Sequence, residues 1–248
     1  MEDIIVVGAT GEIGSEIVKR LINRYRIIAV ARSSESLIAA KESLGNPINF
    51  VPCVADISND NAINVIQESI KGEVRAVIHG PGVPTAGGVL EAPTEALIEA
   101  TNIKVGGMIR LIRAADPSLI KHSRLIAIGG HYGFEPTAYT AAAGIANAAL
   151  VNLMKQYSWA MGPRGITSHV VAPGPADTER LRRVANAKAT QENKNIENVL
   201  SSMREESAIG EFTGTNQVAW AIEMLLAEEA DALAGSTLFM DAGRRKST

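Results

Sequence analysis

The chain lacks most features that mark secreted, membrane-bound or nucleic-acid-binding proteins. Cys53 is its one cysteine, so no disulfide can form within the chain, and its apolar neighbours predict a core residue. No apolar run is long enough to cross a bilayer, and strand-like residues begin where a targeting segment would stand. The 24 Lys and Arg residues are scattered among 27 Asp and Glu residues, which excludes a basic nucleic-acid footprint. We therefore expect a cytoplasmic protein without nucleic-acid or membrane partners, and no metal site.

A glycine-rich stretch near the beginning is the most informative feature that is present. Residues 3–7 suit a buried strand, glycines follow at positions 8, 11 and 14, and an amphipathic run starts at once. Glycines let the backbone turn sharply and approach a ligand, and the unpaired N–H groups at a helix start attract phosphate. We predict a dinucleotide diphosphate at this turn, with a purely structural turn as the alternative. The residues predicted to hold it are Gly8, Thr10, Gly11, Glu12, Ile13 and Gly14.

Strand-like and helix-like segments alternate along the rest of the 248 residues. This alternation, with short connections, predicts an α/β fold: a Rossmann-like, doubly wound parallel sheet of about seven strands with helices on both faces. No repeat, linker or low-complexity tract interrupts it, so we expect residues 1–248 to form one domain. The polar stretch 177–212 is predicted to form exposed helices over the open end of the sheet and to act as a substrate lid.

The end of the second strand bears on the choice of coenzyme. An acidic residue at this position would bind the ribose 2′-hydroxyl of NAD, but the chain has Ala31 followed by Arg32 and Ser33. A guanidinium beside hydroxyl groups suits a 2′-phosphate. We therefore predict NADP, with NAD as the alternative. Glu12 in the glycine loop opposes this choice weakly, and a solvated loop arginine is the other interpretation of Arg32.

Taken together, the motifs resemble those of the short-chain dehydrogenase/reductase family along essentially the whole chain. Asp56-Ile57 resembles the adenine-contacting pair after the third strand, and Asn102-Ile103-Lys104 resembles the Asn-Leu-Lys of the fourth helix. The segment 173–178 fits the Pro-Gly-x-x-x-Thr turn, whose threonine contacts the nicotinamide amide. The resemblance implies cofactor contacts from Asp56, Ile57, Gly80, Pro81, Gly82, Pro173, Gly174 and Thr178.

The family's reaction moves a hydride between nicotinamide and a carbonyl or alcohol carbon, with a tyrosine as acid or base. A lysine one turn later lowers the tyrosine pKa, a serine bonds the substrate oxygen, and an asparagine supports a proton relay. Tyr139 matches the tyrosine and Asn102 the asparagine, whereas Ala143 and Gly130 stand at the lysine and serine positions. The member is therefore atypical. Lys104 is not expected to replace the lysine, because ordinary members commonly have lysine there.

His131 follows the fifth strand directly and is the remaining candidate for proton transfer near neutral pH. An unused loop histidine is the alternative interpretation, and a packing residue is the alternative for Tyr139. We expect an NADP(H)-binding oxidoreductase with a degenerate active site. The competing hypothesis is a non-redox enzyme (lyase, isomerase or dehydratase) or an inactive nucleotide-sensing protein on the same fold. By resemblance, the alanine-rich helix and the C-terminal segment 234–243 imply a homodimer or homotetramer.

Overall fold

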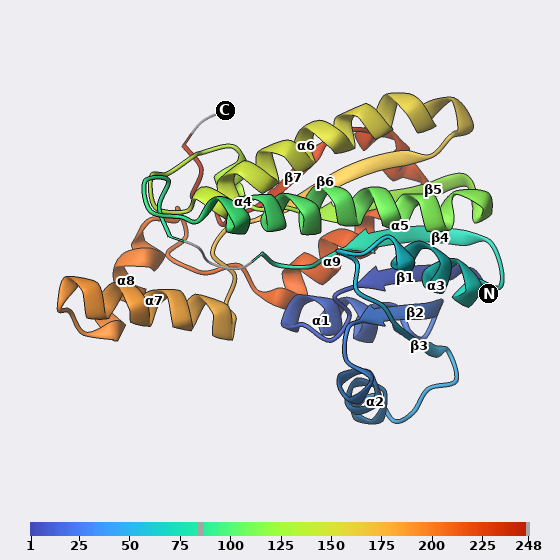
Figure 1. Ribbon diagram of the computed structural model, residues 1–248, viewed down its shortest axis with the longest axis horizontal. Helices are drawn as coiled ribbons and strands as arrows, with labels where there is room; N and C mark the ends of the chain where they lie inside the picture. The colour runs from blue at the N-terminus through green and yellow to red at the C-terminus, as the bar shows by residue number, and fades with distance from the viewer. Residues whose placement is uncertain (84–86, 247–248) are drawn as a thin grey trace.

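The computed structural model describes residues 1–83 and 87–246 and forms a seven-stranded parallel sheet in the order β3-β2-β1-β4-β5-β6-β7 (Figure 1). The strands are β1 (Asp3–Val7), β2 (Arg26–Ala31), β3 (Phe50–Val54), β4 (Val74–His79), β5 (Leu119–Ile128), β6 (Thr167–Pro173) and β7 (Thr237–Met240). All five residues of β1 are buried because the sheet is covered on both faces. Such strands read as continuous apolar runs rather than alternating ones.

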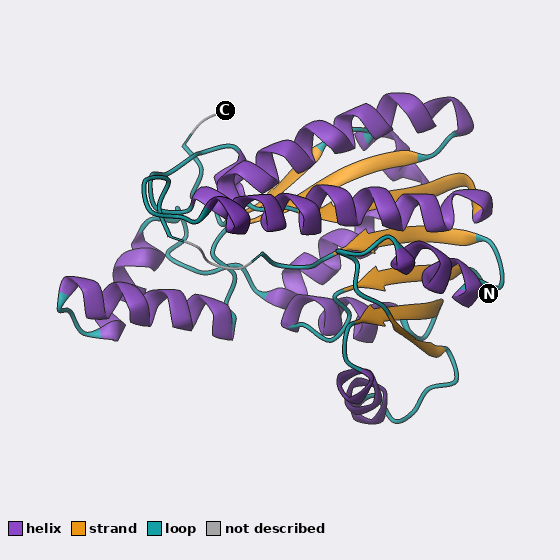
Figure 2. Cartoon of the chain, in the orientation of Figure 1, coloured by secondary structure: helices purple, strands orange, loops and turns teal. Residues whose placement is uncertain are grey.

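Helices cover both faces of the sheet (Figure 2). The helices are α1 (Glu12–Leu21), α2 (Ser34–Ser43), α3 (Asn61–Ser69), α4 (Thr94–Thr101), α5 (Gly107–Ala115), α6 (Ala141–Met161), α7 (Glu179–Glu192), α8 (Ile196–Glu205) and α9 (Thr215–Leu225). One hydrophobic core lies between the sheet and α3, α5 and α6, and a second lies beneath α1, α2 and α9. The predicted doubly wound sheet is confirmed.

Shorter helical turns join or extend these elements. They are η1 (Asn102–Gly106), η2 (Asp116–Ser118), η3 (His131–Gly133), η4 (Gly162–Arg164) and η5 (Glu228–Leu233). The predicted long helix over 93–115 is therefore present as α4, η1 and α5 in one run, and η1 is a π-helical turn that begins at Asn102. Such turns within α-helices are frequent at functional sites.

The alanine-rich helix α6 begins at Ala141, two residues later than the start predicted at Tyr139. Backbone contacts with the loop after β4 account for the difference. The amide of Val89 donates to the carbonyl of Ala138, and the amide of Ala141 donates to the carbonyl of Gly87. These bonds hold Tyr139 in a turn before the helix, with 60% of its surface exposed.

Helices α7 and α8 stand beyond the carboxyl ends of the strands and have a small core of their own (Figure 1). The segment predicted to be a lid therefore lies over the open end of the sheet as expected. Thr178 caps α7 by accepting a hydrogen bond from the amide of Leu181 at 3.3 Å. Residues 84–86 of the loop after β4, which was expected to help define the substrate, lie outside the described residues.

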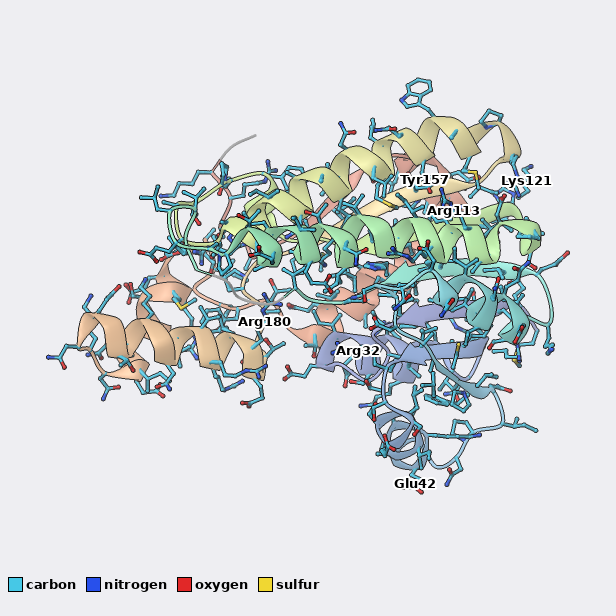
Figure 3. All side chains as sticks on the ribbon, viewed as in Figure 1. Arg32, Glu42, Arg113, Lys121, Tyr157 and Arg180 are labelled. Atoms are coloured by element: carbon cyan, nitrogen blue, oxygen red, sulfur yellow. The ribbon has the colours of Figure 1, made fainter. Side chains whose placement is uncertain are left out.

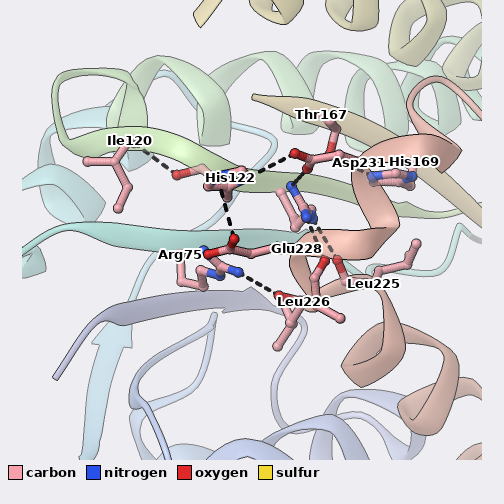
Figure 4. Close-up of polar contacts among 12 residues, drawn as sticks. Arg75, Ile120, His122, Thr167, His169, Leu225, Leu226, Glu228 and Asp231 are labelled. Carbon is pink, nitrogen blue, oxygen red and sulfur yellow. Dashed lines mark hydrogen bonds and ion pairs between the residues drawn. The ribbon is translucent and has the colours of Figure 1, made fainter. Parts of the chain in front are cut away.

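A buried polar network ties the opposite, amino-terminal edge together (Figure 4). Arg124 on β5 is fully buried and donates to the carbonyls of Leu225 and Ala227, each at 2.6 Å. Asp231 pairs with Arg124 at 2.7 Å and with Nδ1 of His122 at 2.8 Å. This network fastens β5 to the end of α9, so a structural role accounts for these ionisable groups. None of the described helices combines the length and the apolar character that a membrane crossing requires.

Candidate functional site

Three glycines shape the turn between β1 and α1. Gly8 has φ +82°, a left-handed conformation that favours glycine. A Cβ at Gly14 would lie 2.1 Å from the carbonyl oxygen of Gly8, so no side chain fits there. Gly11 is the N-cap of α1 and offers no side-chain cap, which leaves the first N–H groups of the helix for a ligand. The residues present therefore fit a diphosphate.

The ends of the neighbouring strands β2 and β4 lie against this turn. The amide of Gly8 donates to the carbonyl of Val30 on β2 at 2.9 Å. A Cβ at Gly8 would lie 3.4 Å from the nitrogen of Pro81, and the amide of Gly80 donates to the carbonyl of Val7 at 3.0 Å. The structure thus brings the predicted cofactor residues of β1 and β4 together at the point where the strand order reverses, which is where ligands bind in such sheets.

Glu12 does not point into this turn as a free carboxylate. Its two oxygens accept hydrogen bonds from the amide of Glu179, at 3.0 and 3.2 Å, at the start of α7. A carboxylate is favoured at a helix N-terminus because the unpaired amides carry partial positive charge. Glu12 therefore links the glycine turn to the start of α7.

The predicted adenosine end contains a cation and a carboxylate. Arg32 is exposed after β2 and forms no ion pair with the described residues (Figure 3). The Ser33 hydroxyl accepts from the amide of Ser36 and donates to Glu35, so it caps α2 instead of standing free. Hydrogen bonds from Ser58, together with the nearby Arg32 charge, hold the pKa of Asp56 below its usual range. Ile57 is buried in the core beneath α5.

The ends of β4 and β6 close the other side of the site. Gly174 donates to the carbonyl of Met240 at 3.0 Å, and its backbone packs against Asp241. Thr178 is buried, and its hydroxyl also donates to the carbonyl of Ala176 at 3.1 Å. Across the gap, Nη1 of Arg180 lies 2.6 Å from the place where a Cβ of Gly82 would stand. Helix α7 therefore reaches the loop after β4 through Arg180 (Figure 3).

Three aromatic residues follow β5 as one group. The rings of His131 and Tyr132 lie 3.9 Å apart, and those of Tyr132 and Tyr139 lie 6.2 Å apart, edge to face. Burial, with the neighbouring Tyr139 hydroxyl, raises the pKa of Tyr132. Burial and the charge of Arg244 lower the pKa of His131 to about 4. The His131 imidazole is therefore neutral near pH 7, and its role in proton transfer stays a prediction.

Asn102 opens the π-helical turn η1, and its side chain is fully engaged. Its Nδ2 donates to the carbonyl of Ser58 at 3.1 Å, and its Oδ1 accepts from Arg110 at 2.9 Å. The predicted relay residue therefore anchors η1 to the connection after β3. Lys155, the lysine further along α6, donates to the carbonyl of Gly235 and lies away from this group.

Two residues to which the sequence assigned no role in the site lie beside the end of β5. Lys104 on η1 is 4% exposed, and its Nζ donates to the carbonyl of Ile128 at 2.7 Å. Burial and the charge of Arg180 lower its pKa to about 7. Asn147 on α6 is 5% exposed, and its carboxamide lies against Gly129 and Gly130. The Asn102-Ile103-Lys104 motif could have indicated Lys104, whereas no sequence signal indicated Asn147.

Comparisons with known proteins agree with this geometry. A family model described as Enoyl-(Acyl carrier protein) reductase matches residues 8–245. The chain is 25% identical to the 3-oxoacyl-[acyl-carrier-protein] reductase FabG of Escherichia coli (strain K12), over 96% of this chain and 95% of that one.

Solved structures agree on the fold. L-sorbose reductase from Gluconobacter frateurii, in complex with NADPH and L-sorbose, has a TM-score of 0.90 at 20% identity, with 100% and 97% of the two chains covered. An NADPH-bound short-chain oxidoreductase from Pseudomonas aeruginosa PAO1, described as containing an atypical catalytic centre, has a TM-score of 0.88 at 19% identity, covering 100% and 98%. With a glycine turn at the strand-order reversal and a family match over nearly its whole length, the chain belongs to the short-chain dehydrogenase/reductase family.

Proposed function

We propose that the chain is an NADP(H)-dependent oxidoreductase that moves a hydride between the coenzyme and a small carbonyl or alcohol substrate. The observation that carries this proposal is the cradle at the start of α1, where Gly14 leaves no room for a side chain and α1 has no side-chain cap. The relatives support it, since the Escherichia coli protein is named as a reductase and both structural neighbours are described with NADPH.

The coenzyme would lie along the carboxyl edge of the sheet. Its diphosphate would take amides between Thr10 and Gly14, where that of Gly11 already donates to the carbonyl of Gly8. Its 2′-phosphate would meet Arg32, whose guanidinium has no ion-pair partner among the described residues. Asp56 and Ile57 would flank the adenine, while Gly80, Pro81, Gly82, Pro173, Gly174 and Thr178 would line the nicotinamide half. The bound coenzyme would supply or accept the hydride.

Tyr139 is the residue proposed to exchange the proton with the substrate oxygen. It is the exposed member of the aromatic group, and the Tyr132 hydroxyl lies beside it as a hydrogen-bond partner. His131 would act as a positioning residue, because its neutral ring stacks on Tyr132 and holds that phenol in place. Asn102 would keep η1, and with it Lys104, in register with the end of β5.

The segment 177–212 would act as a lid over the substrate. Its contacts with the body include the Glu12 carboxylate and Arg180, which are polar contacts that a ligand can replace. Cofactor with substrate should then protect this segment from limited proteolysis. Unchanged cleavage would contradict the lid role.

We also propose a homodimer or homotetramer built on α6 and β7. β7 is the last strand of the sheet, and a groove of about 440 Å³ runs between it and α6, lined in part by Asn152, Lys155 and Ser236. Trp159 on α6 is 79% exposed, which is unusual for so large an aromatic side chain. Sedimentation equilibrium distinguishes these assemblies from a monomer.

The test of the function follows nicotinamide absorbance over a panel of ketones, 3-oxoacyl thioesters, sugars and alcohols, with NADPH and NADH in parallel. We expect turnover with NADPH and weaker binding of NADH. Tight NADPH binding without turnover on any substrate would favour the alternative of a non-redox enzyme or nucleotide sensor. Absence of any thermal shift with all four nicotinamide coenzymes would overturn coenzyme binding itself.

A further inference from the structure

Asn147 occupies space that a side chain at position 130 would otherwise fill. Gly130 follows β5 with φ −178° and ψ 155°, an extended conformation open to any residue. A Cβ built on Gly130 would lie 3.0 Å from Nδ2 of Asn147, and one on Gly129 would lie 4.0 Å from its Oδ1. Conformation does not explain the glycine at 130, but the neighbouring carboxamide does.

Gly133 completes this enclosure. A Cβ there would lie 2.9 Å from the Cβ of Asn147 and 3.0 Å from the amide of Ala148. Glycines at 129, 130 and 133 thus let η3 approach α6 closely and surround one polar side chain on the helix. Such close approach is a recurrent reason for glycine at a functional turn.

The carboxamide itself is left without protein partners. Asn147 is 5% exposed, its Oδ1 is buried without a hydrogen bond, and its Nδ2 donates to no acceptor in the described part of the chain. Leaving a buried polar group unpaired costs about 1–3 kcal/mol. Packing alone would be served better by an apolar residue of similar size, so this asparagine points to a ligand.

We propose that Asn147 supplies the hydrogen bond that the family's serine would give, with its Nδ2 donating to the substrate oxygen. The inference rests on the proposed oxidoreductase function. In the reductive direction a hydride joins the carbonyl carbon, the oxygen takes one proton from Tyr139, and NADPH becomes NADP⁺. Asn147 gains and loses nothing in this step; it stabilises the negative charge that develops on the oxygen. A carboxamide can do this at any pH at which the protein is folded.

The reciprocal exchange of positions gives a sharp test. Asn147→Ala removes the donor, and Asn147→Asp keeps the shape while replacing the amide with an acceptor. In the double variant Gly130→Ser/Asn147→Ala, the shorter alanine at position 147 makes room for a serine side chain at position 130, which matches the family's serine position. Asn64→Asp on the exposed side of α3 is the matched control, because it makes the same chemical change outside the enclosure and away from α6.

We expect both single variants to lower kcat by about 100- to 1,000-fold, the usual effect of removing one donor to a developing oxyanion. The dissociation constant for NADPH, measured by fluorescence, should stay within about twofold, since the lost contact is to substrate and not coenzyme. The double variant should recover at least tenfold of the lost kcat, and Asn64→Asp should match the wild type. Thermal unfolding of each variant separates loss of fold from loss of function.

Retention of kcat within about threefold in both single variants would overturn the inference while leaving the proposed function standing. A lowered melting temperature with unchanged kcat would assign Asn147 a purely structural role. Loss of kcat without recovery in the double variant would contradict the exchange of positions. Absence of turnover by the wild-type protein on the whole substrate panel would overturn the proposed function and this inference with it.

Discussion

Replacing Lys104 with methionine should stabilise the protein at low pH and progressively less as the pH rises. The Lys104 ammonium is buried, bonded only to the carbonyl of Ile128, and has no carboxylate partner among the described residues. Burial and the Arg180 charge lower its pKa from 10.5 to about 7. The other titratable neighbour, His79, has a pKa lowered to about 3 by burial and by Lys104, so it stays neutral throughout the relevant range.

The sign follows from proton binding. Between pH 7 and pH 10.5 the unfolded chain holds a proton on Lys104 that the folded chain has released, so wild-type stability rises with pH in this window. The shift of about 3.5 units corresponds to a full difference of about 5 kcal/mol at about 1.36 kcal/mol per unit. Losing the bond to Ile128 offsets about 1 kcal/mol. The methionine variant should therefore exceed the wild type by about 3–4 kcal/mol below pH 7.

Urea unfolding at pH 6, 7.5 and 9 measures this difference directly. The advantage of Lys104→Met should shrink by about 2.5–3 kcal/mol between pH 6 and pH 9. Lys155→Met is the control, because its ammonium also donates to a carbonyl but is exposed. Parallel pH profiles for wild type and Lys104→Met would show that the buried ammonium stays charged, and the reasoning from burial would then be refuted. Arg180→Gln should move the wild-type transition upward.

Three further substitutions test the coenzyme cradle and its link to the lid. Gly14→Ala brings a Cβ to 2.1 Å from a backbone oxygen. This clash of about 3 kcal/mol should lower the melting temperature by roughly 6–12 °C. Gly11→Ala is the control and should not lower the melting temperature in this way, because a Cβ at Gly11 would make only ordinary contacts. Arg32→Ala should weaken NADPH binding by about 10- to 100-fold while leaving NADH unchanged, as titration with both coenzymes would reveal. Glu12→Ala should tighten NADPH binding several-fold by removing a negative charge near the diphosphate, and it should speed proteolysis within 177–212. Glu16→Ala on the outer side of α1 is its control. Equal NADPH affinities of the two variants would contradict the effect of the Glu12 charge.

The sheet could be predicted from the sequence because each strand can be recognised from its own residues and those beside it. Runs such as residues 3–7 and 74–79 are short, apolar and bounded by glycine or proline, which is what a doubly covered parallel strand requires. The glycine turn was predictable for a similar reason, because the spacing of Gly8 and Gly14 between a strand and a helix can be seen in the sequence. The start of α6 was misplaced because it depends on backbone bonds to the loop after β4, some 50 residues earlier in the chain.

The side-chain environment of the candidate site was less predictable. The sequence places His131 directly after a strand, where an open mouth is expected, but the residue is buried, and this burial, together with the Arg244 charge, lowers the pKa of its imidazole to about 4. Ser33 was predicted as a phosphate ligand, and its hydroxyl caps α2 through the amide of Ser36. A distant segment therefore contributes to the surroundings of His131, whereas the partners of Ser33 lie within three residues of it.

The same limit applies to the predicted serine and lysine positions, where the sequence has Gly130 and Ala143. A comparison of motifs counts the serine and the lysine as missing at Gly130 and Ala143, because it compares each position only with the same position in the family. Folding superimposes elements that are far apart in sequence: the π-helical turn η1 brings Lys104 to the end of β5, and α6 brings Asn147 beside Gly130. Stabilising the charge that develops on the reacting oxygen requires a donor beside it, and this requirement does not depend on which helix carries the donor. If Asn147 is that donor, as we propose, the glycines at 129, 130 and 133 provide the space that its side chain requires.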